Sequence, residues 1–230
     1  MNTNLLKFIV NNKEYLEAFI TEFTYHSNAI EGSTLTYEQT YAILYNDNSF
    51  KITNKESSKI YEAINHKKAL NLVLEYLDKN NKLNEMFIKN INEIINDNIK
   101  DIKEFRKLQV FIQGSEYIPP APEKISNLMM YYIDNYNNDI SDIFTKIAKY
   151  HIEFERIHPF EDGNGRTGRL IINDELLRNN LPPVIISKDD RIKYFEYIRS
   201  NDINGFSEWL KNLSNIEYER IKKYILNINT

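Results

Sequence analysis

The residue types best suited to chemistry gather in one short stretch of this 230-residue chain, 158–169. Three of the chain's six glycines lie there, in the sequence His158-Pro159-Phe160-Glu161-Asp162-Gly163-Asn164-Gly165-Arg166-Thr167-Gly168-Arg169. A histidine can exchange a proton near neutral pH, a carboxylate can hold a divalent metal ion, and paired arginines can grip phosphate oxygens. Because the glycines also let a ligand approach the backbone, the stretch indicates a site for a phosphate compound.

Two familiar motifs resemble parts of this stretch, but neither fits its surroundings. The glycine spacing G-x-G-x-x-G over 163–168 indicates a dinucleotide-binding fold only after a β-strand, and the residues before it have helical periodicity. A calcium-binding EF-hand loop starting at Asp162 would place Arg166 at a ligand position and Asn173 where a glutamate is needed. We therefore disfavour the dinucleotide fold and exclude the EF-hand.

An anion-binding loop between two helices explains the stretch better. The preceding helix must end near residue 157, because Pro159 disfavours helical geometry in the residue before it. Gly163 and Gly165 allow a close approach to the backbone, and a new helix starting near Arg166 turns its free N–H groups toward the loop. Arg166 and Arg169 oppose the helix dipole there, so an anion is expected beside them.

The residues 158–169 resemble the signature of the Fic family, HPFx[DE]GNGRxxR, and match each of its fixed positions. The resemblance covers essentially the whole chain and is strongest over 104–200. It implies an all-α Fic fold, a helical bundle with one small β-hairpin flap, in which residues 1–230 form a single domain. An N-terminal inhibitory helix region is expected at 1–35, the catalytic core at 104–200 and the flap at 110–120.

Family members typically transfer AMP from ATP to a hydroxyl of a target protein, and the resemblance implies the same activity here. His158 would be the general base that takes the proton of a Ser, Thr or Tyr hydroxyl, and Asp162 would hold Mg²⁺ against the α- and β-phosphates. Arg166 would grip the phosphates, and Arg169 would take the γ-phosphate. The other nucleotide-binding residues of the motif would be Gly163, Asn164, Gly165 and Thr167.

The resemblance also assigns contacts outside the motif. The flap would clamp a segment of the target protein by strand addition, through Gly114, Ser115, Glu116 and Tyr117. Contacts to the nucleoside are expected from Tyr194 and Phe195, with Asn201 as a weaker candidate. A flat aromatic face such as that of Phe195 suits adenine stacking.

A second family motif lies near the N-terminus. The residues Ser27-Asn28-Ala29-Ile30-Glu31-Gly32 match the inhibitory pattern [ST]xxxE[GN]. Glu31 can form a two-pronged ion pair with Arg169 only by occupying the space of the γ-phosphate, and Ser27 would support that helix end. Weak basal activity is therefore expected, and whether Glu31 also promotes the reverse removal of AMP stays open.

Other functions stay open at the level of sequence. A transferase of another phosphate-linked moiety, such as UMP or phosphocholine, would share the motif, as would an enzyme that removes AMP. A catalytically silent nucleotide sensor is the alternative from a different class, although a pure binder has no need of His158. Doc-type kinases of the family carry lysine at the position of Gly165, so the glycine favours AMP transfer over phosphate transfer.

Helical periodicity dominates the elements that must position these residues. Apolar residues recur every three or four positions and predict helices over 4–25, 60–77, 86–95, 122–133, 143–157, 166–180, 188–200 and 206–227. Extended structure is expected only at 110–118, as a hairpin, and at 184–186. His151 is expected in the core or behind the site, and His26 and His66 at the surface or partly buried.

Composition narrows the setting of the protein. With 42% hydrophobic and 27% charged residues it is an ordinary soluble globule, without the roughly 20 apolar residues of a membrane span. The net charge of −4 argues against nucleic acid as a partner. The absence of cysteine excludes disulfides and fits a cytoplasmic protein. Expected partners are a target protein, the chain itself as a self-modification substrate, and a second copy in a homo-oligomer.

Overall fold

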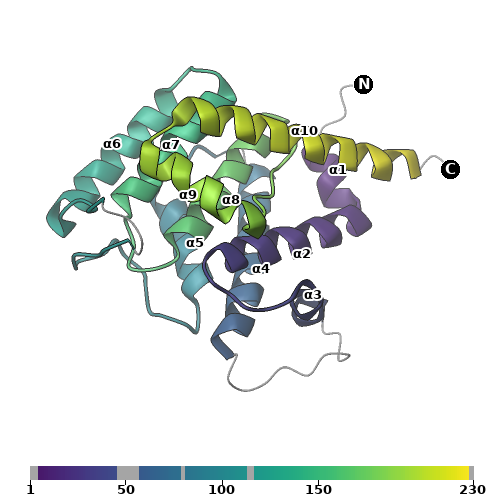
Figure 1. Ribbon diagram of the computed structural model, residues 1–230, viewed down its shortest axis with the longest axis horizontal. Helices are drawn as coiled ribbons and strands as arrows, with labels where there is room; N and C mark the ends of the chain where they lie inside the picture. Colours follow the sequence, from purple (N-terminus) through teal and green to yellow (C-terminus); the bar gives the residue numbers. More distant parts are fainter. Residues whose placement is uncertain (1–4, 46–56, 79–80, 113–116, 228–230) are drawn as a thin grey trace.

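The computed structural model describes residues 5–45, 57–78, 81–112 and 117–227, and its regular elements are all helical (Figure 1). In chain order they are α1 Leu5–Asn11, α2 Lys13–Ile30, α3 Tyr37–Tyr45, α4 Ser57–Asp78, α5 Glu85–Asn96, η2 Pro122–Lys124, α6 Ile125–Asn138, α7 Ile143–Ile157, α8 Asn164–Arg178, η3 Lys188–Asp190, α9 Arg191–Ser200 and α10 Ile203–Asn227. No strand occurs in this described part of the chain. The expected all-α class is therefore confirmed.

Helix α8 lies in the middle of the molecule and carries the second half of the glycine-rich stretch, from Asn164 onward (Figure 1). It packs against α7, α4 and α5, and it also contacts α1 and α2. Nearly all of its fifteen residues are buried, polar ones included. Because a buried polar side chain is costly unless it is hydrogen-bonded, the neighbours of α8 must supply partners for its charged residues.

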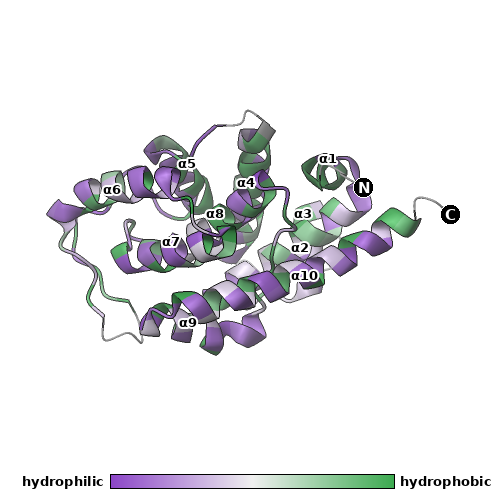
Figure 2. Cartoon of the chain, turned by 90° about the horizontal axis from the view of Figure 1, so that it is seen from above, coloured by the Kyte–Doolittle hydropathy of each residue, from purple (hydrophilic) through white to green (hydrophobic). Residues whose placement is uncertain are grey.

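Two apolar clusters lie on either side of this central helix. One includes Phe19 and Phe23 of α2, and the other includes Ile30 at the end of α2 together with Phe206 and Trp209 of α10. Hydrophobic and hydrophilic residues alternate along each helix in Figure 2, as expected of amphipathic helices around a core. Within the described ranges, no helix has both the length and the apolar character needed to cross a membrane.

Most helix boundaries agree with those expected from periodicity. The helix predicted over 143–157 is observed with those bounds as α7. The helix predicted over 4–25 is divided at Asn12, whose side-chain oxygen accepts a hydrogen bond from the N–H of Tyr15 (2.9 Å) and so caps α2. Helix α2 then continues to Ile30, which places Glu31 at its C-cap.

The hairpin predicted over 110–118 is not formed in the part of that segment that the structure describes. Side chains instead take the carbonyls that a strand ladder would use, because Gln109 Nε2 donates to the oxygen of Pro119 (3.0 Å) and Arg106 Nη2 to that of Pro120 (2.6 Å). Neither proline has an N–H to donate to a ladder. The predicted turn residues lie outside the described residues; they are Gly114, Ser115 and Glu116.

The segment predicted to be extended at 184–186 also pairs with no strand. Its first residue, Val184, donates its N–H to Asn173 Oδ1 (2.7 Å), and its carbonyl accepts from Asn173 Nδ2 (3.0 Å). A side chain of α8 therefore satisfies the backbone that a neighbouring strand would otherwise have satisfied.

Helix α2 is anchored to α10 by a buried polar network. The hydroxyl of Tyr15 donates to Glu217 Oε1 (2.7 Å), and Arg220 pairs with both Glu217 (3.6 Å) and Glu22 (2.5 Å). Tyr15 is fully buried, and its ring packs edge-on against Tyr224. The helix that carries Ser27 and Glu31 is thus part of the core of the bundle.

His66 of α4 is fully buried, so the surface or partly buried position expected for it was wrong. Its Nδ1 lies 3.1 Å from Thr24 Oγ1, and its ring packs against Phe23. A neutral imidazole with a hydroxyl partner can enter a core where a charged one cannot. Burial lowers the pKa of His66 to about 3, and the charges of Arg169 and Arg166 act in the same direction.

We predict that His66 makes the protein less stable as the pH falls from about 6.5 to 3. Below its ordinary pKa of 6.5 the unfolded chain binds a proton on this histidine that the folded protein does not accept until about pH 3. In His66→Gln the free energy of unfolding, measured in urea at several pH values, should depend less steeply on pH across that window. The control is His26→Gln, which should change the slope less; an unaltered slope in His66→Gln would contradict the prediction.

Candidate active site

His158 ends α7 in a left-handed backbone conformation, with φ 51° and ψ 62°. The proline that follows prevents the helix from continuing. The Nδ1 atom of His158 lies 3.3 Å from the backbone oxygen of Glu155. Because a carbonyl only accepts, Nδ1 must carry the proton, and Nε2 is the nitrogen that can accept one from a substrate.

The surroundings of His158 keep its imidazole neutral. Burial lowers the pKa of His158 below its ordinary value and outweighs the hydrogen bond to the Glu155 backbone. The charge of Arg106 acts in the same sense as burial, whereas Glu31 and Asp162 oppose it. At neutral pH the ring is therefore in the unprotonated form that a general base requires.

The loop after His158 is shaped by Asn164, the first residue of α8. Its Oδ1 accepts from the N–H of Phe160 and its Nδ2 donates to the oxygen of Phe160, both at 2.9 Å. Asn164 is 2% exposed, and Phe160 is buried against Phe105. The side chain of Asn164 thus holds the loop in shape, which differs from the phosphate contact expected from the sequence.

Two asparagines of α5 hold the same loop from the opposite side. Asn92 Nδ2 donates to the backbone oxygen of Asp162 (2.9 Å) and to Thr167 Oγ1 (3.1 Å), and Asn96 Nδ2 lies 3.4 Å from the same Asp162 oxygen. The hydroxyl of Thr167 is therefore occupied by α5 and fully buried, rather than directed at a nucleotide as expected. Sequence analysis missed both asparagines, although polar residues four apart on the apolar face of α5 were a signal of a polar contact in the core.

Asp162 is surrounded by positive charge. Its Oδ2 accepts from Lys100 Nζ (2.6 Å), and its Oδ1 accepts from Arg166 Nη2 (3.0 Å) and from the N–H of Gly163 (2.6 Å). Burial alone would raise the pKa of Asp162, but the hydrogen bond from Lys100 and the charge of Arg166 outweigh it and leave that pKa below its ordinary value. The carboxylate is therefore ionised at neutral pH, with one third of its side-chain surface exposed.

The start of α8 has the loop-to-helix geometry that the glycine spacing predicted. Gly163 precedes the helix with φ 79°, a conformation that favours glycine. In the described structure no acceptor takes the backbone N–H groups of Asn164, Gly165 and Arg166, so the helix end presents free donors. Such an end attracts anions, because its donors and the helix dipole act together.

Arg166 adds a buried cation to this loop. Its side chain is only 6% exposed, and of its donors only Nη2 is engaged, by Asp162. The Nε atom is buried without a hydrogen-bond partner among the described residues. An unpaired buried donor on a guanidinium beside a helix N-terminus is well placed for a phosphate oxygen.

Arg169 is the largest fully buried side chain of the protein's described part, and its guanidinium is held from three sides. Its Nε donates to Ser27 Oγ (3.0 Å), its Nη2 to the Ser27 backbone oxygen (2.9 Å) and to Glu31 Oε1 (2.7 Å), and its Nη1 lies 3.4 Å from the hydroxyl of Tyr194. Burial alone would lower the pKa of Arg169, but Glu31 outweighs it and raises that pKa above its ordinary value.

The ion pair between Glu31 and Arg169 is present, but it is not two-pronged as expected. Only Oε1 of Glu31 bonds to the guanidinium, because Ser27 takes the Nε and shares the Nη2. The same Oε1 lies over the first turn of α8, at a point 2.2 Å from where a side-chain carbon at Gly165 would be. The carboxylate therefore lies beside the first turn of α8, in space that a side chain at position 165 would take.

The three residues expected at the nucleoside lie in different surroundings. Tyr194 is fully buried, and its hydroxyl lies 2.7 Å from His151 Nε2, so it packs behind Arg169 and offers no free ring face. Phe195 is partly exposed, and the guanidinium of Arg191 lies over its ring, 4.8 Å from the ring centre. Asn201 is exposed and ends α9 in a left-handed conformation, where asparagine is favoured.

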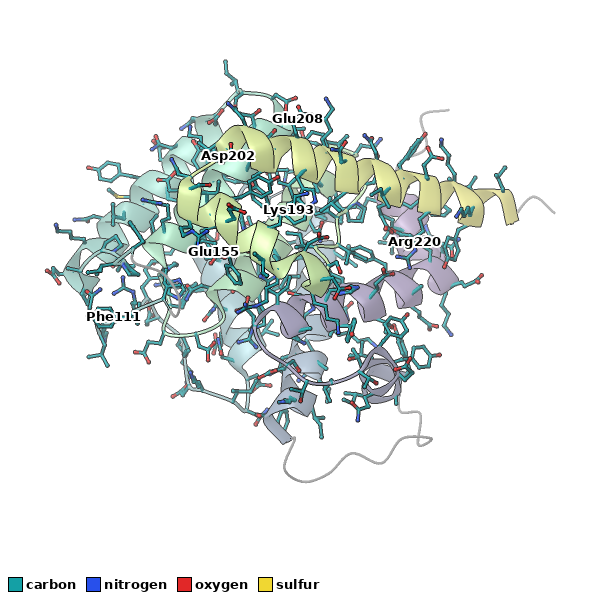
Figure 3. The ribbon with its side chains drawn as sticks, viewed as in Figure 1. Phe111, Glu155, Lys193, Asp202, Glu208 and Arg220 are labelled. Carbon is teal, nitrogen blue, oxygen red and sulfur yellow. The ribbon has the colours of Figure 1, made fainter. Side chains whose placement is uncertain are left out.

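A buried polar layer separates α7 from α8 behind Arg169. His151 is buried as expected, and Glu155, which sequence analysis did not single out, lies 3.9 Å from it with Oε1 lacking a hydrogen-bond partner in the described structure. Figure 3 places Glu155 inside the bundle. Burial raises the pKa of Glu155 to about 8 and lowers that of His151 to about 3, so both are neutral at pH 7.

Of the expected flap residues, only Tyr117 lies within the described part of the chain. The guanidinium of Arg156, near the end of α7, stacks on its ring at 4.1 Å. On the other side of the flap, Phe111 projects at the periphery of the molecule (Figure 3). The end of this segment that begins at Tyr117 therefore lies next to α7.

Comparison with known proteins agrees with this geometry. Residues 82–176 match the model of the Fic/DOC family. The chain is 33% identical over 207 residues to a protein of Aedes aegypti named protein adenylyltransferase Fic, and 31% identical over 217 residues to one of that name in Nematostella vectensis. A solved structure of a Fic domain containing signaling protein from Bacteroides thetaiotaomicron superposes with a TM-score of 0.79 at 27% identity, covering 92% of this chain and 94% of that one.

This chain belongs to the Fic/DOC family, and its helical bundle is the Fic fold. The matches to the mosquito and sea anemone proteins cover 84% and 87% of this chain but only 40% and 48% of those relatives. The chain thus spans less than half the length of the curated relatives it matches.

We predict that Asn164→Asp lowers the free energy of unfolding by about 1–3 kcal/mol, because the aspartate cannot donate to the Phe160 carbonyl and leaves it unpaired in a buried site. Urea unfolding followed by circular dichroism would measure the loss. The exposed Asn215→Asp adds the same charge and should change stability by less than about 0.5 kcal/mol. If Asn164→Asp is as stable as this control, the hydrogen bonds between the Asn164 side chain and the Phe160 backbone are not what holds the loop.

Proposed function

We propose that this chain is a protein adenylyltransferase, which transfers AMP from ATP to a Ser, Thr or Tyr hydroxyl of a target protein. One observation carries the proposal: the imidazole of His158 has its proton on Nδ1 and a free Nε2, at the rim of a helix end with unpaired N–H groups and a buried, half-paired Arg166. A base that faces a phosphate-binding loop has the geometry of a phosphoryl-transfer site. The names of the relatives support the same activity.

In the proposed reaction, the target's hydroxyl oxygen forms a bond to the α-phosphorus of ATP. The bond from that phosphorus to the oxygen bridging the β-phosphate breaks, and diphosphate leaves with that oxygen. The hydroxyl proton passes to Nε2 of His158, which the lowered pKa keeps ready to accept it at neutral pH. The free N–H groups of α8 and the guanidinium of Arg166 would stabilise charge on the phosphates.

Asp162 fits the role of a magnesium ligand. Its carboxylate is ionised and lies at the proposed phosphate-binding loop. Among the described residues, Oδ2 accepts a hydrogen bond from the exposed side chain of Lys100 alone. Mg²⁺ in phosphoryl-transfer sites is commonly held by one or two carboxylates together with substrate phosphates, so a single aspartate suffices. When bound, the ion would neutralise charge on the ATP phosphates. Lys100 would have to leave Oδ2 at that point.

The segment 108–120, which contains the expected flap 110–120, is the proposed docking site for the target protein. Leu108, Phe111 and Ile118 are exposed apolar residues of its described part. Large exposed apolar side chains that are grouped in this way are typical of protein-binding surfaces. An extended segment of the target would pair with this part of the backbone and bring its hydroxyl to His158.

We further propose that Glu31 inhibits this activity. Its carboxylate lies on Arg169 and over the first turn of α8, in the place where the outermost phosphate of ATP would bind. The Glu31 carboxylate and a phosphate bound to the same guanidinium would lie so close together that they would repel each other strongly. ATP would therefore bind poorly, or with its α-phosphate out of line for attack.

Replacing Glu31 with glycine should increase self-labelling by labelled ATP roughly 10-fold or more, because a charge-assisted hydrogen bond that competes with the phosphate, about 1.5–3 kcal/mol, is removed. Ser27→Ala should have a smaller effect, since the carboxylate stays. Glu22→Gly, on the same helix but away from Arg169, is the control for general loosening of α2. Equal labelling by wild type and Glu31→Gly would refute the proposed brake.

His158→Ala should abolish AMP transfer in the Glu31→Gly background while ATP binding, measured by calorimetry, stays within about twofold, because the imidazole takes a proton but holds no phosphate. This separates an enzyme from a nucleotide sensor, for which no activity would depend on His158. The change should be compared with His26→Ala, a histidine remote from the motif. If both variants label equally, His158 is not the base.

The nature of the transferred group can be tested with the same Glu31→Gly protein. Labelled ATP, UTP and CDP-choline, offered in parallel with lysate proteins, should give protein-bound label from ATP alone, confirmed as AMP by mass spectrometry. Label from UTP or CDP-choline instead would replace the adenylyltransferase with a transferase of another phosphate-linked group. Exposed tyrosines such as Tyr131 are candidate self-modification sites in this experiment.

A further inference from the structure

Arg106 is buried beside the proposed active site and has no part in the reaction described so far. It is only 3% exposed, yet among the described residues it has no carboxylate partner. Every hydrogen bond of its guanidinium goes to a backbone carbonyl. Burying a cation without a carboxylate partner costs free energy. The hydrogen bonds of Arg106 to these carbonyls must offset that cost, so the backbone segments that it joins are the reason for its position.

The four carbonyls come from two different parts of the site. At the end of α7, Nε donates to the oxygen of His158 (2.7 Å), and Nη2 lies 3.4 Å from that of Ile157. In the proposed docking segment, Nη1 donates to the oxygen of Leu108 (3.0 Å) and Nη2 to that of Pro120 (2.6 Å). One planar group therefore touches both ends of 108–120 and the peptide of the proposed base.

We propose that Arg106 is a positioning residue that couples the target-docking segment to His158, by fixing the two ends of 108–120 against the peptide that carries the imidazole. This proposal rests on the proposed function, because that function supplies the target protein which the segment 108–120 would hold. No side-chain atom of Arg106 needs to touch substrate. Its role is to set the distance between the bound target segment and the base.

The backbone of His158 explains why such a support is needed. A residue other than glycine is strained in the left-handed conformation, and His158 adopts it with φ 51°. Arg106 bonds to this peptide from its side chain, and its own N–H donates to the oxygen of the following Pro159 (2.8 Å). These bonds fix the peptide plane from which the imidazole projects toward the Glu155 carbonyl.

The charge of Arg106 has a second effect on the same ring. After burial and the bond to the Glu155 backbone, it is the next largest influence on His158, and it lowers the pKa of the imidazole. The other charged groups facing the ring, Glu31 and Asp162, raise that pKa. A neutral residue at 106 would therefore leave His158 protonated to higher pH, when it cannot act as a base.

Two variants separate the hydrogen bonds from the charge. Arg106→Lys keeps the charge, but one ammonium nitrogen cannot reach all four carbonyls, whereas Arg106→Met removes both. Lys107→Met, at the exposed neighbouring position, is the matched control. In the Glu31→Gly background we expect self-labelling to fall at least tenfold in both Arg106 variants, with ATP affinity within about twofold of the control. Only Arg106→Met should also move the acid limb of the pH–rate profile to higher pH.

Two measurements on the protein without nucleotide test the proposal independently of any transfer activity. His158, assigned in NMR spectra by its loss in His158→Ala, should titrate at higher pH in Arg106→Met and nearly as in wild type in Arg106→Lys. Chymotrypsin should cleave after Phe111 several times faster in both variants. If the wild type transfers no AMP, the proposed function fails while these two readouts still decide the role of Arg106. Titration and cleavage matching Lys107→Met in both variants would overturn it.

Discussion

The buried guanidinium of Arg169 is the constraint on which the arrangement of the site depends. A full positive charge in the middle of a helical bundle must be compensated within the protein, and α8 itself offers no carboxylate to do so at that point. The end of α2 supplies the compensation through Ser27 and Glu31, and α9 adds the hydroxyl of Tyr194. The charge that would attract the outer phosphate of a nucleotide therefore also holds three helices together.

This explains why the segment with the inhibitory pattern is built into the core. Helix α2 is joined to α10 by Tyr15 and Glu217 and contributes to both apolar clusters, so its end is held firmly beside α8. Glu31 itself follows the last turn, keeps about a third of its side-chain surface exposed, and precedes Gly32 at φ 97°. In the proposed inhibited state, the anion is thus a partly exposed side chain at the end of a helix that is anchored in the core.

The loops of the site have no strand or helix to satisfy their backbone, and long polar side chains take over that task. The side chain of Asn164 bonds to the backbone N–H and carbonyl of Phe160, and Asn92 donates to the carbonyl of Asp162. Arg106 lies within hydrogen-bond distance of four backbone carbonyls, including that of His158. Each of these side chains is buried, so the bonds are made away from water, where an unpaired carbonyl would be most costly. Precise loop geometry is obtained here from amide and guanidinium groups that bond to the backbone of the loops.

The sequence by itself determined the helical class, most helix positions, the glycine-preceded start of α8 and the pairing of Glu31 with Arg169, because helical periodicity, glycine spacing and the two short motifs are local patterns. It could not reveal the division of the first helix at Asn12, or that the described residues of 110–118 form no strand; side chains bond to the backbone in both places. Only the tertiary structure decided that the side chains of Asn164, Thr167 and Tyr194 lie within bonding distance of other protein groups, and that Asn92 and Arg106 support the site. The physical reason is that a buried polar group takes whichever partner the packing brings within reach, and those partners come from helices distant in the chain.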